Sequence, residues 1–202
     1  MATPASKGTK GEARRSEIMA EARKVLLDDG YQKLSLRQIA ARLNISVGNL
    51  QYYFPSKDDL VETVLTQEID TSLQLMHSAW QGDGEEDSPT RNIVRALLHH
   101  HASDAGRFYA IAEALALHDP RYARLKARGY SSVFREVEGL VGPQVPQLNA
   151  DQRRRLTRIL VALIDGASLQ IQFGMVSAPT TAIDALADDV AAAISHLTEN
   201  WR

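Results

Sequence analysis

The chain of 202 residues contains no cysteine. It can therefore form neither a disulfide scaffold nor a Cys-ligated zinc or iron–sulfur site, and it carries no thiol nucleophile. Proline and glycine are scarce, with 7 and 12 residues. No apolar run approaches the roughly 18 residues that a membrane-spanning helix needs, and the polar start MATPASKGTKGEARR lacks the apolar stretch of a secretory signal. These absences predict a cytoplasmic protein without a membrane segment.

The formal net charge of -2 conceals two parts of opposite sign. Residues 1–57 carry 10 basic and 5 acidic side chains, whereas residues 58–202 carry 13 basic and 20 acidic ones. A basic segment joined to an acidic body indicates a polyanionic partner for the basic segment alone. We therefore expect one domain at residues 1–57 and a second at residues 58–202.

Apolar residues recur at intervals of three and four from about residue 13 onward, which predicts an all-α fold of about nine helices. The first dozen residues are small and polar, so residues 1–12 are expected to form a flexible arm. Gly30 is expected to end the first helix. The composition of residues 81–90 and 177–179 predicts loops between later helices.

Two short helices with a tight turn between them are predicted within the basic segment. Ser35 and Ser46 are expected to cap them, Asn44 to take the left-handed conformation that ends the first, and Pro55 to stop the second. This pattern is typical of a helix-turn-helix, because a short second helix can enter a major groove about 12 Å wide with its first residues at the base edges. The pattern predicts double-stranded DNA as the partner.

Residues 14–65 resemble the N-terminal DNA-binding domain of the TetR family of transcriptional regulators. The resemblance is carried by four pieces in order: Gly30-Tyr31, SLRQIA at 35–40, ISVGNL at 45–50 and YFPSKDDL at 53–60. It departs from the family at Leu26, where an aromatic residue is usual, and at Gln51, where a tyrosine is usual. The second departure replaces a phosphate contact of the family with a side chain that can read a base.

The resemblance implies two sets of DNA-binding residues. Those implied to contact phosphates are Ser35, Arg37, Ser46, Tyr53 and Lys57. Those implied to face the groove are Val47, Gly48, Asn49, Gln51 and Tyr52. Asparagine and glutamine can pair bidentately with adenine. The serines also cap their helices when no DNA is bound, and Tyr53 can be a core ring whose hydroxyl alone reaches DNA.

In the TetR family the C-terminal helices form an effector pocket and a dimer, and here the resemblance is confined to residues 112–125 and 163–170. The expected pocket residues are His77, Phe108, His118, Tyr130 and Phe134, although each aromatic ring is individually more readily a core residue. A glycine within a helix costs roughly 1 kcal/mol relative to alanine, so Gly166 suggests close helix approach. The expected dimer interface comprises Leu163, Gly166, Ala187, Val190 and Ile194, unless these stripes pack only within one chain.

No catalytic motif is present: the sequence has no Gly-rich phosphate loop, no paired metal ligands on a helix and no GxSxG elbow. The run His99-His100-His101 cannot converge on one ion, because successive helical residues point about 100° apart. We expect no enzyme, metal or cofactor. The sequence predicts a homodimeric repressor that a small molecule releases from a pseudo-palindromic operator. A ligand-independent DNA-binding or adaptor protein is the alternative, followed by an enzyme. The acidic body favours a neutral or cationic effector.

Overall fold

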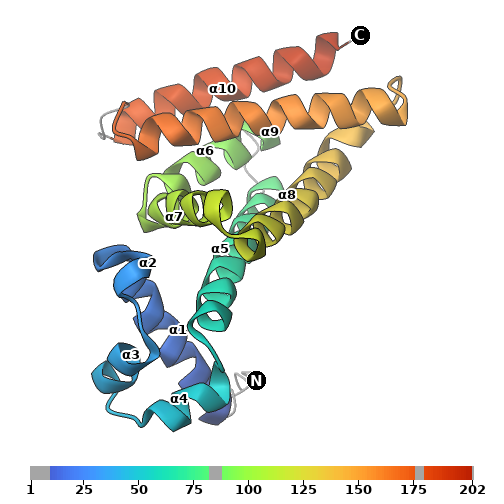
Figure 1. The fold of residues 1–202 in the computed structure, drawn as a ribbon. Helices are drawn as coiled ribbons and strands as arrows, with labels where there is room; N and C mark the ends of the chain where they lie inside the picture. The colour runs from blue at the N-terminus through green and yellow to red at the C-terminus, as the bar shows by residue number, and fades with distance from the viewer. Residues whose placement is uncertain (1–9, 82–87, 176–179, 202) are drawn as a thin grey trace, which may run out of the picture. The chain divides into compact units, whose positions relative to one another are not determined.

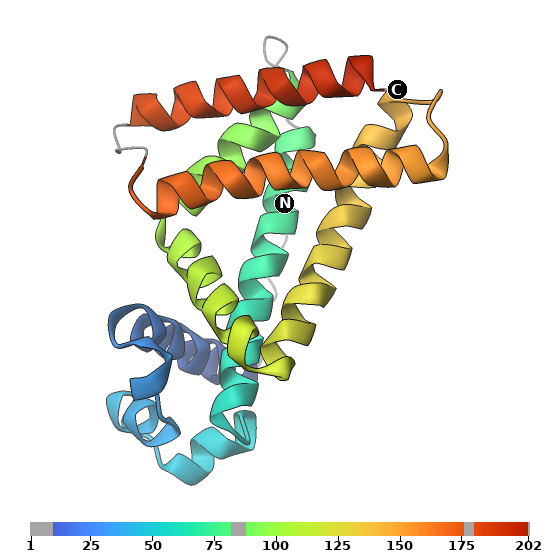
Figure 2. The same ribbon diagram turned by 45° about the horizontal axis from the view of Figure 1, so that its top comes forward.

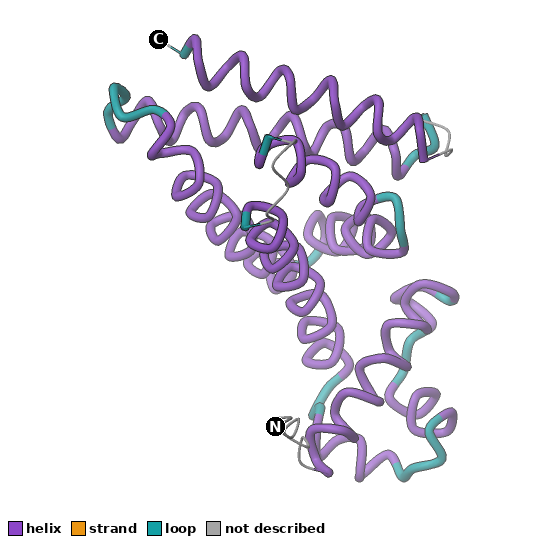
Figure 3. The backbone as a smooth tube through the Cα atoms, turned by 180° about the vertical axis from the view of Figure 1, so that it is seen from behind, coloured by secondary structure: helices purple, strands orange, loops and turns teal. Residues whose placement is uncertain are grey.

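The computed structural model describes residues 10–81, 88–175 and 180–201, and every regular element in these ranges is helical (Figures 1 and 3). The predicted all-α fold is confirmed. In chain order the helices are α1 (Lys10–Asp28), α2 (Gly30–Lys33), α3 (Leu36–Arg42), α4 (Val47–Tyr53), α5 (Lys57–Trp80), α6 (Pro89–His101), α7 (Asp104–His118), α8 (Pro120–Val141), the short 3-10 helix η1 (Gly142–Gln144), α9 (Ala150–Gln172) and α10 (Thr180–Asn200).

The described residues contain one α-helix more than the nine that periodicity predicts. The additional element is α2, a single turn of four residues. Gly30 has a φ of 79°, in the left-handed region that favours glycine, and it ends α1 as predicted. The chain then returns to helical geometry at once, which the apolar pattern does not reveal because α2 contains no buried residue.

Helix α1 begins at Lys10, so the prediction of a flexible arm through residue 12 is wrong for residues 10–12. Glu12 lies in the first turn, where a carboxylate is stabilised by the positive end of the helix dipole. Residues 1–9 of the predicted arm lie outside the described residues, as do residues 82–87 and 177–179 of the predicted loops.

The chain divides into two compact units, Met1–Gln67 and Glu68–Arg202. The division falls within α5, whereas the sequence alone places the boundary after Lys57. Leu60, Val61 and Val64 in the first turns of α5 are buried. The N-terminal unit therefore includes the start of this helix. The second unit, residues 68–202, is called the body below.

In the N-terminal unit, the apolar face predicted for the first helix is buried. Its members are Ile18, Ala22, Val25 and Leu26, and Ile39, Ala40, Leu50 and Phe54 of the following segments are buried as well. Helix α3 packs against both α1 and α4. Charge adds to this packing, since Arg42 at the end of α3 forms ion pairs with Glu21 (3.1 Å) and Asp29 (3.1 Å). These contacts hold α3 in place on α1.

The predicted caps and turn of the two short helices are confirmed. The Ser35 hydroxyl oxygen accepts a hydrogen bond from the Gln38 backbone N–H (3.2 Å), and Ser46 does the same for Asn49 (3.1 Å). Asn44 is the single described non-glycine residue with positive φ, at 53°. Asparagine tolerates this conformation better than most residues. The turn between α3 and α4 is thus encoded locally.

In the body, α10 packs along both α6 and α9 (Figure 2). The core between these helices includes Leu98 of α6, Leu156 and Leu160 of α9, and Ile183 and Ala187 of α10. Helix α7 packs against α8, and both contact α9; in Figure 2 α7 and α8 converge below α9. This second group of helices brings together the polar side chains described in the next subsection.

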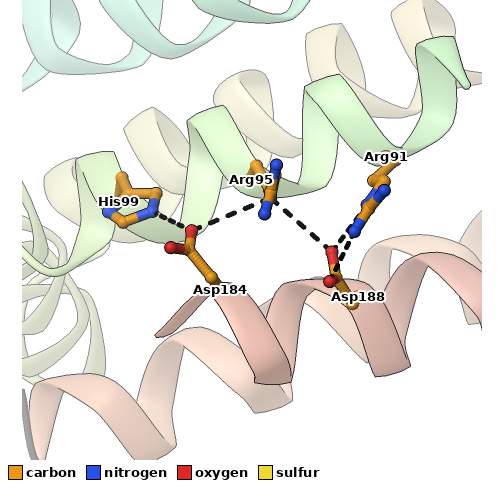
Figure 4. Close-up of polar contacts among 5 residues, drawn as sticks. All are labelled: Arg91, Arg95, His99, Asp184 and Asp188. Carbon is orange, nitrogen blue, oxygen red and sulfur yellow. Dashed lines mark hydrogen bonds and ion pairs between the residues drawn. The ribbon is translucent and has the colours of Figure 1, made fainter. Parts of the chain in front are cut away.

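A row of ion pairs fixes the register of α6 on α10 (Figure 4). Arg91 donates two hydrogen bonds to Asp188, at 2.7 and 2.6 Å. Arg95 lies between Asp184 and Asp188, at 3.7 and 3.6 Å, and His99 contacts Asp184 at 2.8 Å. The Arg91 hydrogen bonds lower the pKa of the Asp188 carboxyl. Because the pairs are partly exposed to solvent, they contribute specificity of alignment more than stability.

We predict that Asn44→Ala destabilises the α3–α4 turn by about 1 kcal/mol, because the left-handed conformation that the turn requires is less favourable for alanine than for asparagine. Asn44→Gly is expected to cost less, since glycine adopts positive φ without a steric penalty. Amide hydrogen exchange of α3 and α4 measures the local opening free energy. Equal losses in the two variants would show that the Asn44 side chain, and not its backbone conformation, supports the turn.

Candidate nucleic-acid interface and effector site

Helix α4 has one buried side chain and an open polar face. Leu50 is buried, whereas Gly48, Asn49 and Gln51 are exposed. Tyr52 is 82% exposed, which is unusual for a large aromatic side chain. The helix begins after the Ser46 cap and ends before the extended Phe54, which precedes proline. This short helix, with one buried face, presents amide and aromatic side chains to the solvent on its other face.

The residues predicted to contact phosphates differ in whether their side chains already bind other groups of the chain. Ser35 and Ser46 accept bonds from backbone N–H groups, which leaves each hydroxyl hydrogen available to an external acceptor. Arg37, in the first turn of α3, is exposed and has no ion pair among the described residues. Arg42 on the same helix is instead held by two carboxylates. Arg37 is thus the available guanidinium of α3.

Lys57, predicted as a phosphate contact, is held by Tyr31. Its ammonium donates to the Tyr31 carbonyl oxygen at 2.5 Å and lies 3.8 Å from the centroid of the Tyr31 ring. The Tyr31 hydroxyl in turn donates to Asp58 at 2.6 Å. Burial lowers the pKa of Lys57. An ammonium has three donors, so a phosphate contact by Lys57 would use those that Tyr31 leaves over.

The remaining residues of the predicted interface are half-buried. Val47 lies in the first turn of α4, and Tyr53 ends the helix. The Tyr53 ring meets the exposed Tyr52 ring edge to face, with centroids 5.2 Å apart. The Tyr53 ring is therefore partly covered, which is compatible with the prediction that only its hydroxyl reaches DNA. All the predicted DNA-binding residues lie in the N-terminal unit.

A polar cluster lies between α5, α7, α8 and α9 of the body. The Tyr130 hydroxyl of α8 donates to the Asp165 carboxylate of α9 at 2.8 Å. The hydroxyls of Tyr109 on α7 and Ser72 on α5 are hydrogen-bonded to each other at 2.5 Å. We call Ser72, Tyr109, Tyr130 and Asp165 the body cluster. Its members come from four helices, so a small molecule bound beside them would contact most of the body's framework.

Burial and negative charge dominate the electrostatics of the body cluster. Burial raises the pKa of Asp165 above its ordinary value, and the neighbouring Glu113 raises it further. Burial, assisted by the charges of Glu68 and Asp165, raises the pKa of Tyr109 to about 12. Burial also lowers the pKa of His101 to about 4, so His101 is neutral at pH 7. The cluster is a weakly solvated site in which one carboxyl group, that of Asp165, lies among tyrosine hydroxyls.

The residues predicted to line an effector pocket do not form one group. Tyr130 and Phe134 are neighbours on α8, with ring centroids 5.7 Å apart. Phe108 is completely buried. His77 is exposed and contacts Glu136 at 3.0 Å, and His118 is exposed at the end of α7. The structure therefore joins two of the predicted residues to the body cluster through Tyr130, and it places both histidines at the surface.

Sequence reasoning did not select Asp165 and Tyr109 as pocket residues. One signal was present: Asp165 is the single charged residue between positions 159 and 172 of an otherwise apolar helix. A lone acid in such a helix indicates a partner from another element. The identity of that partner, Tyr130, depends on the packing of α8 on α9, which the sequence pattern does not give.

Two of the residues predicted for the dimer interface have little surface left for a partner. Ala187 is fully enclosed by its own chain and Ile194 is 6% exposed, whereas Val190 is half-buried and packs partly against the same core. The selection of Ala187 and Ile194 is therefore corrected. Their apolar stripe faces α6 and α9 of the same protomer. Periodicity predicts the stripe, but it does not predict whether the stripe packs within the chain or against a partner. Leu163 is likewise packed in part against this core.

Helix α9 has a second apolar stripe that is open to solvent. Its members are Ile159, Ala162, Gly166, Leu169 and Phe173, spaced by three and four residues. Phe173 is 67% exposed, and Ile159 and Leu169 are exposed as well. A Cβ added at Gly166 would meet nothing within 4 Å. Close packing within the chain thus gives no reason for this glycine. We call these five residues the α9 stripe.

Within the described part of the chain, no group of three or more His, Cys, Asp or Glu side chains is placed to hold a metal ion. The histidine run illustrates why: His99 contacts Asp184 of α10, whereas His101 contacts Ser168 of α9 at 2.5 Å. The two rings point to different helices. A separate finding is that none of the described helices is both long and apolar enough to cross a membrane.

The sequence is similar to known bacterial regulatory proteins. The family model described as "Bacterial regulatory proteins, tetR family" matches residues 18–64. The chain is 28% identical over 169 residues to the HTH-type nicotine-responsive transcriptional repressor HdnoR of Paenarthrobacter nicotinovorans, covering 78% of this chain and 82% of that protein.

Solved structures share the fold along nearly the whole chain. Salmonella enterica GusR superposes with a TM-score of 0.73 at 16% identity, covering 95% of this chain and 98% of that one. A transcriptional regulator from Saccharomonospora viridis, solved in complex with choline, gives a TM-score of 0.66 at 17% identity and covers 94% and 97% of the two chains. Together with the capped helix-turn-helix and its exposed second helix, the family-model match shows a tetR-family regulatory domain at residues 18–64, and the superpositions show that the chain as a whole has the fold of these solved structures.

Proposed function

We propose that this chain is a homodimeric transcriptional repressor that leaves its DNA operator when a small molecule binds in the body. The observation that carries the proposal is the exposed polar face of α4, with Asn49, Gln51 and Tyr52 beside a buried Leu50. A nicotine-responsive repressor is 28% identical over most of the chain, which supports both repression and a response to a ligand. Its place of action would be the cytoplasm, where it meets DNA.

The N-terminal unit is suited to major-groove recognition. The length of α4, 7 residues, fits a groove about 12 Å wide, and its amide side chains can read adenine. Arg37 and the hydroxyls of Ser35 and Ser46 would bind phosphates and fix the docking, because phosphate contacts position a protein while base contacts specify a sequence. The basic charge of residues 1–57 would supply most of the binding strength.

We further propose that the α9 stripe forms the centre of a two-fold dimer interface. The stripe is exposed, apolar and free of charge, and Gly166 at its middle would let the same helix of a second protomer approach closely. Exposed residues of α10, such as Ala185 and Ala192, would extend it. A two-fold dimer presents two α4 helices, so the operator should be a pseudo-palindrome.

Helix α5 would transmit the response. It runs without a break from Lys57 to Trp80, and its second half contacts the other helices of the body. Ser72 is bonded to Tyr109 of α7, and Ile69 lies so close to Gly129 of α8 that a Cβ there would be 2.9 Å away. A ligand that separates α7 from α8 would therefore displace α5. To reverse a 99:1 population it must favour the released state by about 10⁴-fold.

Two other functions stay less favoured. A ligand-independent DNA-binding or adaptor protein would have no use for an aspartate and two tyrosines brought together from three helices of the body. No observation supports a reaction, and regulators of this family are in general not enzymes. We therefore propose no catalysis and no cofactor for this chain.

A DNA-binding titration tests the proposed function. The duplex is an operator selected from random sequences by the full-length protein. Arg37→Ala should weaken binding to every sequence and reduce the slope of log affinity against log salt by about one unit, as expected for one lost phosphate contact. Gln51→Ala should cost about 1 to 3 kcal/mol on the selected operator and much less on unrelated DNA.

The matched control is Arg124→Ala, which removes an exposed arginine of the body and should leave affinity and slope unchanged. Wild-type affinity and slope in Arg37→Ala would contradict the proposed docking. A uniform loss in Gln51→Ala on all sequences would assign that residue to backbone positioning.

The oligomeric state tests the proposed dimer interface. Leu169→Arg should convert the dimer to a folded monomer, since it places a charge within the α9 stripe. Leu117→Arg is the control, because Leu117 of α7 is 81% exposed but lies outside the stripe. Ile194→Arg should instead destabilise the protomer itself, because Ile194 is buried in its core. Light scattering and circular dichroism separate these outcomes, and a dimeric Leu169→Arg protein would place the interface elsewhere.

A further inference from the structure

The Asp165 carboxyl group is ionisable and partly accessible to solvent. It lies half-buried on α9 and accepts a hydrogen bond from the Tyr130 hydroxyl. Among the described residues it forms no ion pair. The ammonium of Lys126, whose charge lowers the pKa of Asp165 against the effect of burial, is itself bound to Glu113 at 2.7 Å. Ionisation of a half-buried carboxyl group that forms no ion pair is costly, and a cationic ligand beside it would offset that cost.

The charges that act on this region are mostly negative. The charges of Glu68 and Asp165 act on Tyr109, and those of Asp165 and Glu113 act on Tyr130, whereas the Lys126 ammonium acts on Asp165. His101, packed edge to face on Tyr109 with centroids 4.8 Å apart, is neutral at pH 7. Arg107 of α7 is exposed and pairs with Asp104 at 3.3 Å. A bound anion would be repelled and a bound cation attracted.

Aromatic rings stand beside the carboxylate. Tyr130 and Phe134 lie on one face of α8, with their ring planes inclined at 35° and their centroids 5.7 Å apart. The Lys126 ammonium already lies 5.4 Å from the Tyr130 ring centroid, within the range of a cation–π contact. Tyr130, Phe134 and Asp165 are all half-buried, so a ligand can reach them. Aromatic faces next to a carboxylate are the groups that bind quaternary and protonated amines.

We propose that the effector is an organic cation, a quaternary or protonated amine, whose charge lies against Asp165 and whose apolar body lies on the rings of Tyr130 and Phe134. This inference rests on the proposed function, because it names the chemical class of that function's effector. The Tyr130 hydroxyl positions the carboxylate. Lys126 stays with Glu113, so the incoming cation would be the counter-ion that Asp165 lacks.

The test uses charged probes and their neutral isosteres on the full-length protein. Choline is compared with 3,3-dimethylbutan-1-ol, and benzyltrimethylammonium with neopentylbenzene, because each pair has nearly the same shape and differs in charge. Isothermal calorimetry and thermal shift measure binding. The cations should bind, and each neutral isostere should bind at least 10-fold more weakly. Loss of the Phe134 ring in Phe134→Leu should weaken the cations by a smaller factor.

Asp165→Asn is the central variant and should weaken cation binding at least 10-fold. It should fold, because burial opposes ionisation of this carboxyl group and an amide carries no charge. Burial raises the folded-state pKa of Asp165, so stability is lost as pH rises from the unfolded-state pKa through the folded-state pKa, and the amide avoids this loss. The melting temperature of the variant should therefore equal or exceed that of the wild type at pH 7. Asp70→Asn, which neutralises an exposed acid of α5, is the matched control.

Three results would overturn the inference: no cation binds, the neutral isosteres bind equally well, or Asp165→Asn keeps its affinity for the cations. Binding to the selected operator, measured on the same preparations, separates this failure from failure of the proposed function. If a neutral or anionic compound releases the operator while cations do nothing, the proposed function stands and the cationic effector is refuted. If the protein binds no operator sequence at all, the proposed function itself fails.

Discussion

A single unbroken helix belongs to both compact units of this protein. Helix α5 has 24 residues, about 36 Å of backbone, and the division between the units falls inside it. Its first turns bury Leu60 and Val64, whereas Ile69 and Ser72 in its second part contact α8 and α7 of the body. A helix without proline or a kink passes a displacement from one end to the other. The proposed control of DNA binding by the body would depend on this continuity.

Helix α9 carries residues of both the proposed effector site and the proposed dimer interface. Asp165 and Gly166 are neighbours in sequence and point about 100° apart, so one belongs to the body cluster and the other to the α9 stripe. The periodicity of one helix thus places the proposed effector site beside the proposed dimer interface. A ligand that shifts α9 by contact with Asp165 would also act on the partner protomer. Such coupling is reciprocal, because operator binding must lower the affinity for the ligand by the same factor as ligand binding lowers the affinity for the operator.

The sequence predicts the N-terminal unit in detail because its structure is encoded locally. Ser35 and Ser46 lie three residues before the N–H groups that they cap, and Asn44 needs no distant contact to take its positive φ. The family resemblance of residues 14–65 adds the likeness to a DNA-binding domain. Helix α2 was missed because a single turn without buried residues leaves no periodic signal.

The body is harder to predict because its features join distant segments. The apolar stripe of Ile194 is visible in the sequence, but whether it faces its own chain or a partner depends on α6, about a hundred residues earlier. Likewise, Tyr130 and Asp165 are 35 residues apart, and their hydrogen bond exists only because α8 packs on α9. Periodicity identifies faces of helices, whereas the pairing of those faces requires the fold.

The most direct test of the account measures operator binding while benzyltrimethylammonium is added. Fluorescence anisotropy of a labelled operator reports the affinity of the full-length protein at each concentration of the cation. The account predicts that saturating cation lowers the operator affinity of the wild type at least 10-fold and leaves that of Asp165→Asn unchanged. An unchanged wild-type affinity at cation concentrations where calorimetry shows the body to be occupied would contradict it.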